Sequence, residues 1–418
     1  MSESHLALPA LIAGIGYCMV EETTKESEAL LDSARSGKID LSSRRFGDIT
    51  VQALTRILSG RSFLSQNIHT LDLSYCYINL PHTERLAQAL KAHPNLQVVN
   101  LSGNNLGHNG TLVFAAALEK MPALRELDFS WNNIGDDGML GMSSLLGKSA
   151  SLEHLDLTSN EIGDVGTKSL ASSLEKNLAT KIYELDLGGN NICDAGAEDL
   201  AAMLKVNRTL YKLNLTGNKI SDVGVGSLAS ALEKNLYLRQ LILSSNSIGA
   251  AGADRLAIAL KINQGIQIID LSNNGIGAEG AASLAVTLAI NQDIQGIDLH
   301  YCKIGPEGAK SLAKALARNY GLQKLNLGGN KIGNIGAQVL AEALTHNQNL
   351  KELDLNNNQI DDHGAAYLIE ALTNNRTIKR IHLSGNSISE ERMQQISFCR
   401  KTEQFAIKSI KMFHKEEK

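Results

Sequence analysis

Aromatic residues are scarce in this chain of 418 residues, and neither sign of charge dominates it. Phe, Trp and Tyr make up 4% of the sequence, with a single tryptophan. The core must therefore be aliphatic, and any exposed aromatic side chain becomes informative. The 40 basic and 44 acidic residues give a net charge of −4. This leaves no basic excess of the kind that non-specific nucleic-acid binding requires, so we expect no nucleic-acid partner.

Cysteine pairs and long apolar runs are also missing. The five cysteines are scattered and form no C-x-x-C pair or metal-ligand spacing. We therefore expect a reduced, cytoplasmic protein without a disulfide framework, a metal or a cofactor. The apolar stretch from Leu6 to Val20 is too short to span a bilayer and is broken by glycine and proline. No Lys or Arg precedes it, so it lacks the first part of a secretory signal, and we expect no stable membrane insertion.

Motifs of catalysis are absent as well. The sequence contains no H-E-x-x-H, G-x-S-x-G or G-x-x-x-x-G-K-[ST] string. The strings GDVGTKS (163–169) and GPEGAKS (305–311) resemble a phosphate loop only superficially, because their glycine spacing is wrong. Too many expected strands separate His154, His300 and His382 for them to share one metal. The sequence therefore favours a protein that is not an enzyme.

What the chain does contain is a repeat. The string L-x-x-L-x-L-x-x-N-x-I, followed by a Gly-rich turn and a Leu/Ala stretch, recurs thirteen times. Its Asn-type position falls at Arg44, Cys76, Asn104, Asn132, Asn160, Asn190, Asn218, Asn246, Asn274, Cys302, Asn330, Asn358 and Asn386. The interval is 28 residues in ten of twelve cases, with 32 before Cys76 and 30 before Asn190. A fixed period of this length indicates a solenoid of stacked units.

Within one repeat the pattern predicts a strand, a turn and a helix. Leu155 and Leu157 alternate with polar residues, which is typical of a short strand with one buried side. The amide of Asn160 can pair with buried backbone groups of the turn, so stacked repeats would form a ladder of asparagines. Leucines and alanines at helical spacing follow, and the helix is expected to end at Asn177, where a residue that tolerates the left-handed conformation is favoured.

The stacking distances predict curvature. Strands pair at about 4.8 Å, whereas packed helices need about 8–10 Å. The strands must therefore line a concave face, and the helices a convex face.

Runs such as LxLxxNxIGxxGAxxLAxAL, from about Ile39 to Ile388, resemble leucine-rich repeats of the ribonuclease-inhibitor-like subtype. Similar arrays occur in ribonuclease inhibitor, in the sensor arms of NOD-like receptors, in the GTPase-activating protein for Ran, and in injected bacterial effectors, including those of the Legionella type. The resemblance implies an α/β leucine-rich-repeat solenoid, a horseshoe with parallel strands on the concave face and helices on the convex face, that binds protein.

The pattern predicts three regions: an N-terminal cap (1–38), thirteen leucine-rich repeats (39–388), and a C-terminal cap with a tail (389–418). A capping box at Thr23–Glu26 indicates a helix in the N-terminal cap. For the C-terminal region we favour a cap helix and a frayed tail, with membrane-surface contact or a bacterial secretion signal as alternatives. The two extra residues before Asn190 predict a bulge in the loop between Asn177 and Ile182.

Strand alternation places a row of acids on the concave wall. Its densest part is one cluster formed by Glu126, Asp128, His154, Asp156, Glu184 and Asp186. Later repeats shift toward positive charge through Lys212, Lys219, Lys324, Lys331 and Arg380. Such a wall can dock a basic patch of a partner. The alternative is inheritance of the L-D-L string common in this subtype.

Aromatic residues mark the rim beside this wall. Tyr75, Trp131 and Tyr301 directly precede an Asn-type position, and Tyr77 follows one. Exposed Trp and Tyr residues are favoured binding anchors, although these rings could instead stack over neighbouring backbone. We take Trp131 with the nearby acids as the expected hot spot. Tyr75, Tyr77, His300 and Tyr301 complete the candidate site.

Together these patterns predict a monomeric, non-enzymatic scaffold that grips one folded protein partner through its concave face and rim. An injected bacterial effector acting on a host protein, in the host cytosol, fits this build. The alternative function is regulation of an enzyme, by a GTPase-activating or an inhibitory protein.

Overall fold

The computed structural model describes residues 30, 36–60 and 67–398. The expected capping box, most of the N-terminal cap and the C-terminal tail from 399 lie outside these ranges. The chain forms two compact units, Met1–Asn190 and Asn191–Lys418. The boundary lies directly after the 30-residue interval that ends at Asn190.

The first unit alternates strands with helices. Its elements are β1 (Lys38–Asp40), α2 (Asp48–Leu58), β2 (Thr70–Asp72), α4 (Leu80–Lys91), β3 (Val98–Asn100), α5 (Gly107–Leu118), β4 (Glu126–Asp128), α6 (Gly135–Lys148), β5 (His154–Asp156), α7 (Asp164–Lys176) and β6 (Glu184–Asp186). Each strand pairs with the next one in parallel, and the register matches the repeat.

The second unit continues the same alternation. Its elements are α8 (Asp194–Val206), β7 (Lys212–Asn214), α9 (Asp222–Leu232), β8 (Gln240–Ile242), α10 (Ala250–Leu260), β9 (Ile268–Asp270), α11 (Gly277–Leu288), β10 (Gly296–Asp298), α12 (Gly305–Leu316), β11 (Lys324–Asn326), α13 (Gly333–His346), β12 (Glu352–Asp354), α14 (Asp362–Asn374), β13 (Arg380–His382) and α15 (Glu390–Phe398). Its strands also pair in parallel and in sequence order.

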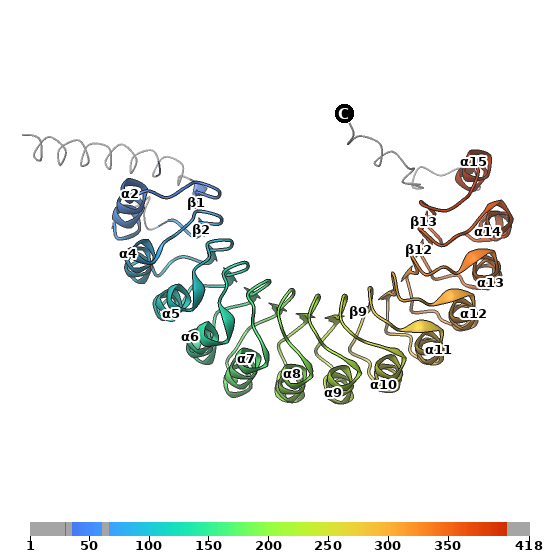
Figure 1. Cartoon of the computed structure of the whole chain (residues 1–418), viewed down its shortest axis with the longest axis horizontal. Coiled ribbons are helices and arrows are strands. Elements are labelled where there is room, and N and C mark those ends of the chain that lie inside the picture. Colours follow the sequence, from blue (N-terminus) through green and yellow to red (C-terminus); the bar gives the residue numbers. More distant parts are fainter. Residues whose placement is uncertain (1–29, 31–35, 61–66, 399–418) are drawn as a thin grey trace, which may run out of the picture. The chain divides into compact units, whose positions relative to one another are not determined.

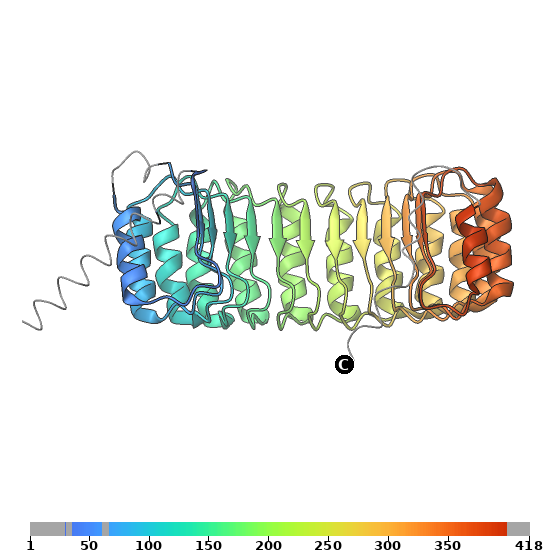
Figure 2. The same cartoon turned by 90° about the horizontal axis from the view of Figure 1, so that it is seen from above.

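The predicted layering is confirmed within each unit. The strands line the inner side of the curve and the helices the outer side, as Figure 1 shows, and the strands lie side by side across the face seen in Figure 2. Leu155 and Leu157 of the strand side are buried, and so are Leu170 and Leu174 of α7. The core is mainly aliphatic because leucine, isoleucine and alanine fill most of these positions, although Phe114 and Phe129 replace leucine in two repeats.

The predicted asparagine ladder is present and accounts for the turn after each strand. The Oδ1 atom of Asn132 accepts hydrogen bonds from the backbone N–H groups of Asn104 and Leu106, at 3.2 and 3.3 Å. Its Nδ2 donates to the carbonyl oxygens of Leu101 and Phe129, at 2.9 and 3.0 Å. Each rung therefore satisfies buried backbone groups of two repeats at once.

Two rungs of the ladder carry a thiol in place of the amide. The Sγ atoms of Cys76 and Cys302 donate to the carbonyl oxygens of Leu41 and Leu271, both at 3.1 Å. Both cysteines are fully buried. Burial raises the pKa of Cys76 to about 11 and that of Cys302 to about 12. These cysteines are therefore structural parts of the turn.

A second asparagine ladder joins the ends of the helices. The Nδ2 atom of Asn235 donates to the carbonyl oxygens of Leu204 and Asn207, and its Oδ1 accepts from the N–H groups of Tyr237 and Leu238. Asparagines continue this ladder at 263, 291, 319, 347 and 375.

Asn177 follows the same rule in the first unit, where its Nδ2 donates to the carbonyl oxygens of Leu146 and Ser149. Its φ is −85°, so the expectation of a left-handed residue at this helix end is wrong. The asparagine is used for its amide group, which satisfies carbonyl groups of the preceding repeat, and not for its tolerance of positive φ.

Candidate functional site

The residue before each ladder position adopts a left-handed backbone. Tyr75, Trp131 and Tyr301 have φ values of 55°, 59° and 52°. Seven of the other repeats hold residues that tolerate this conformation, with glycine at 103, 189, 217, 329 and 385 and asparagine at 273 and 357, and three hold serine, at 43, 159 and 245. A left-handed conformation costs most residues roughly 1–2 kcal/mol. The backbone therefore disfavours an aromatic residue in this slot.

All four rim aromatics are exposed. The exposed fraction is 59% for Trp131, 51% for Tyr75, 76% for Tyr77 and 48% for Tyr301. Large amphipathic side chains with few rotatable bonds are effective anchors when they are accessible in this way.

Stacking over backbone, the alternative for these rings, also occurs. A Cβ atom on Gly103 would overlap the ring of Tyr75, and one on Gly329 would overlap the ring of Tyr301. Each tyrosine therefore lies against the next repeat while one side of it remains accessible. The slot that follows Trp131 holds Ser159 instead of glycine, so Trp131 differs from both tyrosines.

The concave wall of the first unit gathers the six residues expected there. Strand register places His154 between Glu126 and Glu184, and Asp156 between Asp128 and Asp186.

The imidazole of His154 is held by the neighbours it contacts. Its Nδ1 atom lies 3.7 Å from Oε2 of Glu184. The ring also meets that of Tyr183 edge-on, with 6.1 Å between centroids. Tyr183 is a member of this surface that the strand pattern missed, because it lies just before β6.

The inner row of aspartates has a structural role. Oδ1 of Asp128 accepts hydrogen bonds from the backbone N–H and the hydroxyl of Ser130, at 2.9 and 2.7 Å. Asp156 and Asp186 close the equivalent turns of their own repeats, where each accepts a hydrogen bond from the backbone N–H of the residue two positions later. Asparagine does so at 100, 214 and 326. The turn therefore accounts for this row and supports its interpretation as repeat inheritance.

The outer row is not explained by the turn. Glu126 and Glu184 stand two residues before the aspartates on the same side of their strands, and the hydrogen bonds of the turns go to those aspartates. If one part of the acidic cluster serves a partner, it is this outer row.

Adjacent carboxylates influence each other in the cluster. Burial raises the pKa of Asp156, hydrogen bonds from Thr158 oppose this effect, and the charges of Asp186 and Asp128 raise the pKa further. The wall therefore holds negative charge at an electrostatic cost, which a basic partner would relieve.

The remaining candidate residues follow other strands of the first unit or lie in the second unit. Tyr75 and Tyr77 follow β2, two strands away from Trp131, which follows β4. His300 and Tyr301 belong to the second unit, where their rings pack edge-on with centroids 4.1 Å apart.

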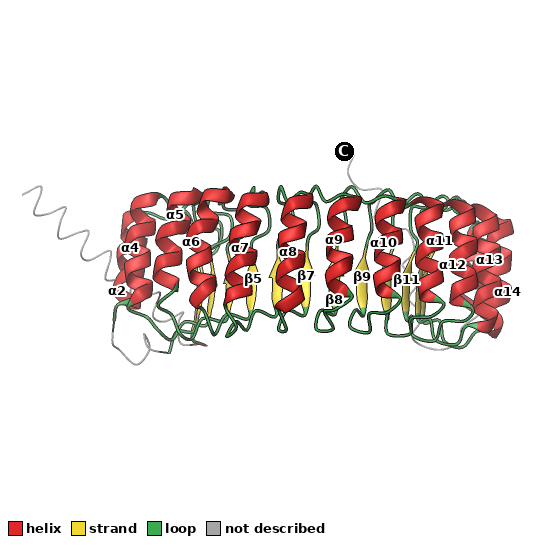
Figure 3. Ribbon diagram, turned by 90° about the horizontal axis from the view of Figure 1, so that it is seen from below, coloured by secondary structure: helices red, strands yellow, loops and turns green. Residues whose placement is uncertain are grey.

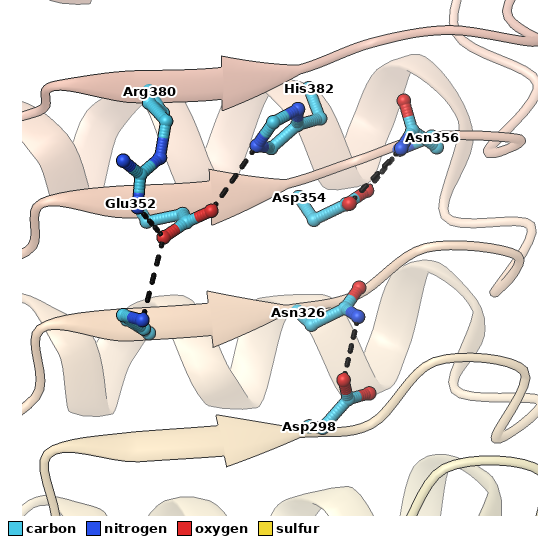
Figure 4. A network of polar contacts seen from close by, with 8 residues as sticks. Asp298, Asn326, Glu352, Asp354, Asn356, Arg380 and His382 are labelled. Atoms are coloured by element: carbon cyan, nitrogen blue, oxygen red, sulfur yellow. Dashed lines mark hydrogen bonds and ion pairs between the residues drawn. The ribbon is translucent and has the colours of Figure 1, made fainter. Parts of the chain in front are cut away.

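Sequence reasoning did not single out a charged network in the second unit. Glu352 accepts hydrogen bonds from Arg380 and His382 (Figure 4). The Nζ atom of Lys324 lies 3.9 Å from the same carboxylate. The hydrogen bond from Arg380 holds the pKa of Glu352 below its usual value. Nearby, Nδ2 of Asn326 donates to Asp298 at 2.7 Å. Comparing residues 28 positions apart would have revealed the alternating signs of Lys324, Glu352 and Arg380.

Two further searches concern only the part of the chain that the structure describes. There, no group of three His, Cys, Asp or Glu residues is arranged to hold a metal ion. No helix in those ranges is long and apolar enough to cross a membrane.

Parallel strands that alternate with helices at a fixed period define this molecule as an α/β repeat solenoid. The sequence profile of the Leucine Rich repeat family matches ten segments that together cover more than half of the chain. These are 92–115, 120–143, 148–171, 179–201, 206–229, 234–257, 263–285, 291–313, 322–341 and 346–368. The chain therefore belongs to the leucine-rich repeat family. Members of this family generally act as protein-interaction scaffolds, and their solenoids are typically not enzymes.

Solved structures similar to this chain include an internalin, InlF, from Listeria monocytogenes, with 19% identity and a TM-score of 0.49, covering 88% of this chain and 86% of that one. A leucine-rich repeat protein from Leptospira interrogans has 17% identity and a TM-score of 0.43, with coverage of 91% and 98%. The TLR13–ssRNA13 complex has 19% identity and a TM-score of 0.40, with coverage of 79% and 38%. No curated protein sequence matches the chain.

Proposed function

We propose that this protein is a monomeric, non-enzymatic scaffold that binds one folded protein partner through the concave face and rim of its repeats. The repeats of 39–388 supply the binding surface, and 1–38 and 389–418 act as its caps. Repeats of the ribonuclease-inhibitor-like subtype, with their full helices, fit this role. We further propose an injected bacterial effector that acts on a host protein in the host cytosol.

The conformation of Trp131 is the observation that carries this proposal. This side chain is 59% exposed and sits in a slot with a φ of 59°, where glycine would cost less. Bulky residues in disfavoured conformations cluster at binding sites, where the contacts they make offset the strain. Trp131 follows β4, whose concave side carries Glu126 and Asp128.

The acidic residues on the strands near Trp131 indicate the charge of the surface that the partner would present. Glu126, Asp128, Asp156, Glu184 and Asp186 make this stretch of the wall acidic. A basic patch on a folded protein complements such a surface, and the field between adjacent carboxylates would accelerate its approach. Nucleic acid, which is negatively charged, would be repelled by the same surface.

A pull-down can test the proposal without disturbing the fold. Trp131→Gly removes the anchor and relieves the left-handed strain, so the variant should fold at least as well as the wild type. Glu126→Lys reverses a charge of the outer row, whereas Asp128→Lys would also break the turn to Ser130. Ser245→Gly is the matched control, because Ser245 occupies the same slot with a φ of 54°.

Proteins captured by the wild type and the Ser245→Gly control, but lost from a Trp131→Gly, Glu126→Lys variant, are the candidate partners. Equal capture by all three proteins would reject this surface as the binding site.

The alternative is a regulator of an enzyme, which would use the same wall to cover or activate its target. If a captured partner is a GTPase, a turnover assay separates the two functions. A scaffold leaves the hydrolysis rate unchanged at saturating concentration, whereas a GTPase-activating or inhibitory protein alters it.

A further inference from the structure

Two positions on the outer side of each repeat are polar or small in nearly every case, with an exception in two neighbouring repeats of the second unit. Elsewhere on the helices, exposed large apolar residues such as Leu140, Val223 and Ile335 occupy other positions. Twelve residues after the ladder position lie Gln88, Ala116, Ser144, Ser172, Ala202, Ser230, Lys314, Glu342 and Glu370. Sixteen residues after it lie Ala92, Lys120, Lys148, Lys176, Val206, Lys234, Arg318, His346 and Asn374. Only the two repeats of α10 and α11 place a large aliphatic residue at both positions.

These two repeats form an aliphatic patch. The repeat of α10 contributes Ile258 and Ile262, and the repeat of α11 contributes Val286 and Ile290. Their exposed fractions are 59%, 61%, 60% and 52%, respectively. The two helices are direct neighbours, as Figure 3 shows. Ile258 and Val286 lie within α10 and α11, and Ile262 and Ile290 lie in the turns directly after these helices. Because the intervening cap residues Lys261 and Ala289 keep a helical backbone, the two residues of each pair, four positions apart, project from the same face. An exposed apolar surface that spans two neighbouring helices is typical of a docking site.

A buried hydrogen bond fixes these two helices to each other. The hydroxyl of Thr287 on α11 donates to the carbonyl oxygen of Ala257 on α10, at 2.7 Å. The equivalent position in the other repeats of this unit from α8 to α14 holds Met203, Ala231, Ala259, Ala315, Ala343 or Ala371. None of these side chains can donate a hydrogen bond. The patch therefore lies on a rigid platform, which lowers the entropy lost when a partner docks.

Basic residues border the patch on both sides. Lys314 and Arg318 of the next repeat occupy the two equivalent positions, and Lys234 occupies one of them in the repeat before. All three are exposed, and within the described ranges none of them forms an ion pair. The nearest acid on α10, Asp254, already accepts a hydrogen bond from Ser283. The charge around the patch therefore favours an acidic occupant.

We propose that the aliphatic patch docks an amphipathic helix of a protein partner whose flanks are acidic. A helix lying along α10 and α11 would present apolar residues at i, i+3, i+4 and i+7 to the four aliphatic side chains. Its acids would pair with Lys234, Lys314 and Arg318. The chain's own tail (399–418) is disfavoured as occupant, because its six basic and three acidic residues give it a positive charge. The patch lies on the convex surface and is independent of the concave site proposed above.

A peptide-binding experiment tests the proposal directly. The probe is a fluorescein-labelled helical peptide with leucines at i, i+3, i+4 and i+7 and glutamates on both flanks. A second peptide carries lysines in place of the glutamates. Fluorescence anisotropy with the full chain should give at least tenfold tighter binding for the acidic peptide, because only its flanks complement the basic border.

Two variants locate the site. Ile262→Glu introduces a charge into the patch and should weaken binding of the acidic peptide at least tenfold. Ile335→Glu is the control, since Ile335 is 63% exposed on α13 and lies outside the patch. It should leave the affinity unchanged, as should Trp131→Gly. Melting temperatures of both isoleucine variants should match that of the wild type, because the substituted side chains are largely solvent-exposed.

Four results would overturn the proposal. The first is absence of binding, or equal binding of the two peptides. The second is unchanged affinity in Ile262→Glu. The third is a wild-type dimer, seen by light scattering, that Ile262→Glu separates into monomers, because a second copy would then be the occupant. The fourth is binding to phosphatidylglycerol vesicles that the same substitution abolishes, because the patch would then meet a lipid surface.

Discussion

The ring of Tyr301 lies against Gly329, its counterpart in the next repeat, in the space that a side chain at that position would occupy. Gly329 has a φ of +68°, so both its conformation and its surroundings require glycine. Tyr75 and Gly103 repeat this arrangement in the first unit. An aromatic residue in the left-handed slot is therefore accommodated by the repeat that follows it.

Gly329→Ala should destabilise the fold by about 1–2 kcal/mol from backbone strain alone, and by more because the ring of Tyr301 must move. Removing that ring in a Tyr301→Ala background should recover part of the loss. Urea unfolding of the four proteins of this cycle measures the coupling, which we expect to exceed about 0.5 kcal/mol. Strictly additive effects would mean that the ring and the glycine do not depend on each other.

Asn132→Ala should cost at least about 1–3 kcal/mol, because it leaves buried N–H and C=O groups of two repeats without partners. Chemical denaturation compares this variant with Gln88→Ala on the exposed face of α4. That control should change the free energy of unfolding by less than about 0.5 kcal/mol. Equal effects in the two variants would show that the ladder contributes no special stability.

The thiols of Cys76 and Cys302 should resist iodoacetamide at pH 8 in the folded protein. Burial raises their pKa to about 11 and about 12, so at this pH both remain protonated, and the thiolate is the reactive form. Peptide mass spectrometry should find both cysteines modified only after the chain is unfolded in urea. Cys193, which is only half-buried, is the internal reference. Native-state modification of Cys302 as fast as that of Cys193 would contradict this account.

Asp156→Asn should stabilise the protein at neutral pH by roughly 0.2–1 kcal/mol, by removing one of several adjacent like charges. The amide can still accept from Thr158, as the asparagines at 100, 214 and 326 do in their turns. The pKa of Asp156 is raised in the folded state, so the protonated carboxyl group contributes favourably to the free energy of unfolding. This contribution is complete below the pKa of the unfolded state and is lost as pH rises through the pKa of the folded state.

The advantage of Asp156→Asn should therefore shrink as pH falls through the folded-state pKa of Asp156 and disappear below the unfolded one. Thermal unfolding of variant and wild type across this pH range measures the difference. An advantage that persists at pH 3, or a loss of stability at pH 7, would mean that the charge of Asp156 is not the destabilising feature.

Most of the fold could be predicted from the sequence. Alternation around Leu155 and Leu157 predicts the strand, because it depends only on neighbours in one repeat. The exposure of Trp131 also followed from its place beside a ladder residue. The ladder joins neighbouring repeats, and it could be predicted because the amide at Asn160 recurs at a fixed period.

Other features depend on contacts between repeats and could not be predicted in this way. Nothing within one repeat shows that Asn177 satisfies carbonyl groups of the preceding repeat. The bond from Thr287 to Ala257 joins two repeats, so its significance emerges only from their packing. The aliphatic patch on α10 and α11 is different, since aligning the repeats would have shown it without a structure.

The central claim is that Trp131 anchors a protein partner on the acidic wall of the first unit. Its most direct test is the dissociation constant of a partner captured by the wild type, measured by calorimetry for Trp131→Gly and for the matched Ser245→Gly control. We expect at least tenfold weaker binding for Trp131→Gly, unchanged binding for Ser245→Gly, and a melting temperature no lower than that of the wild type in both. An affinity of Trp131→Gly within twofold of the wild type would contradict the account.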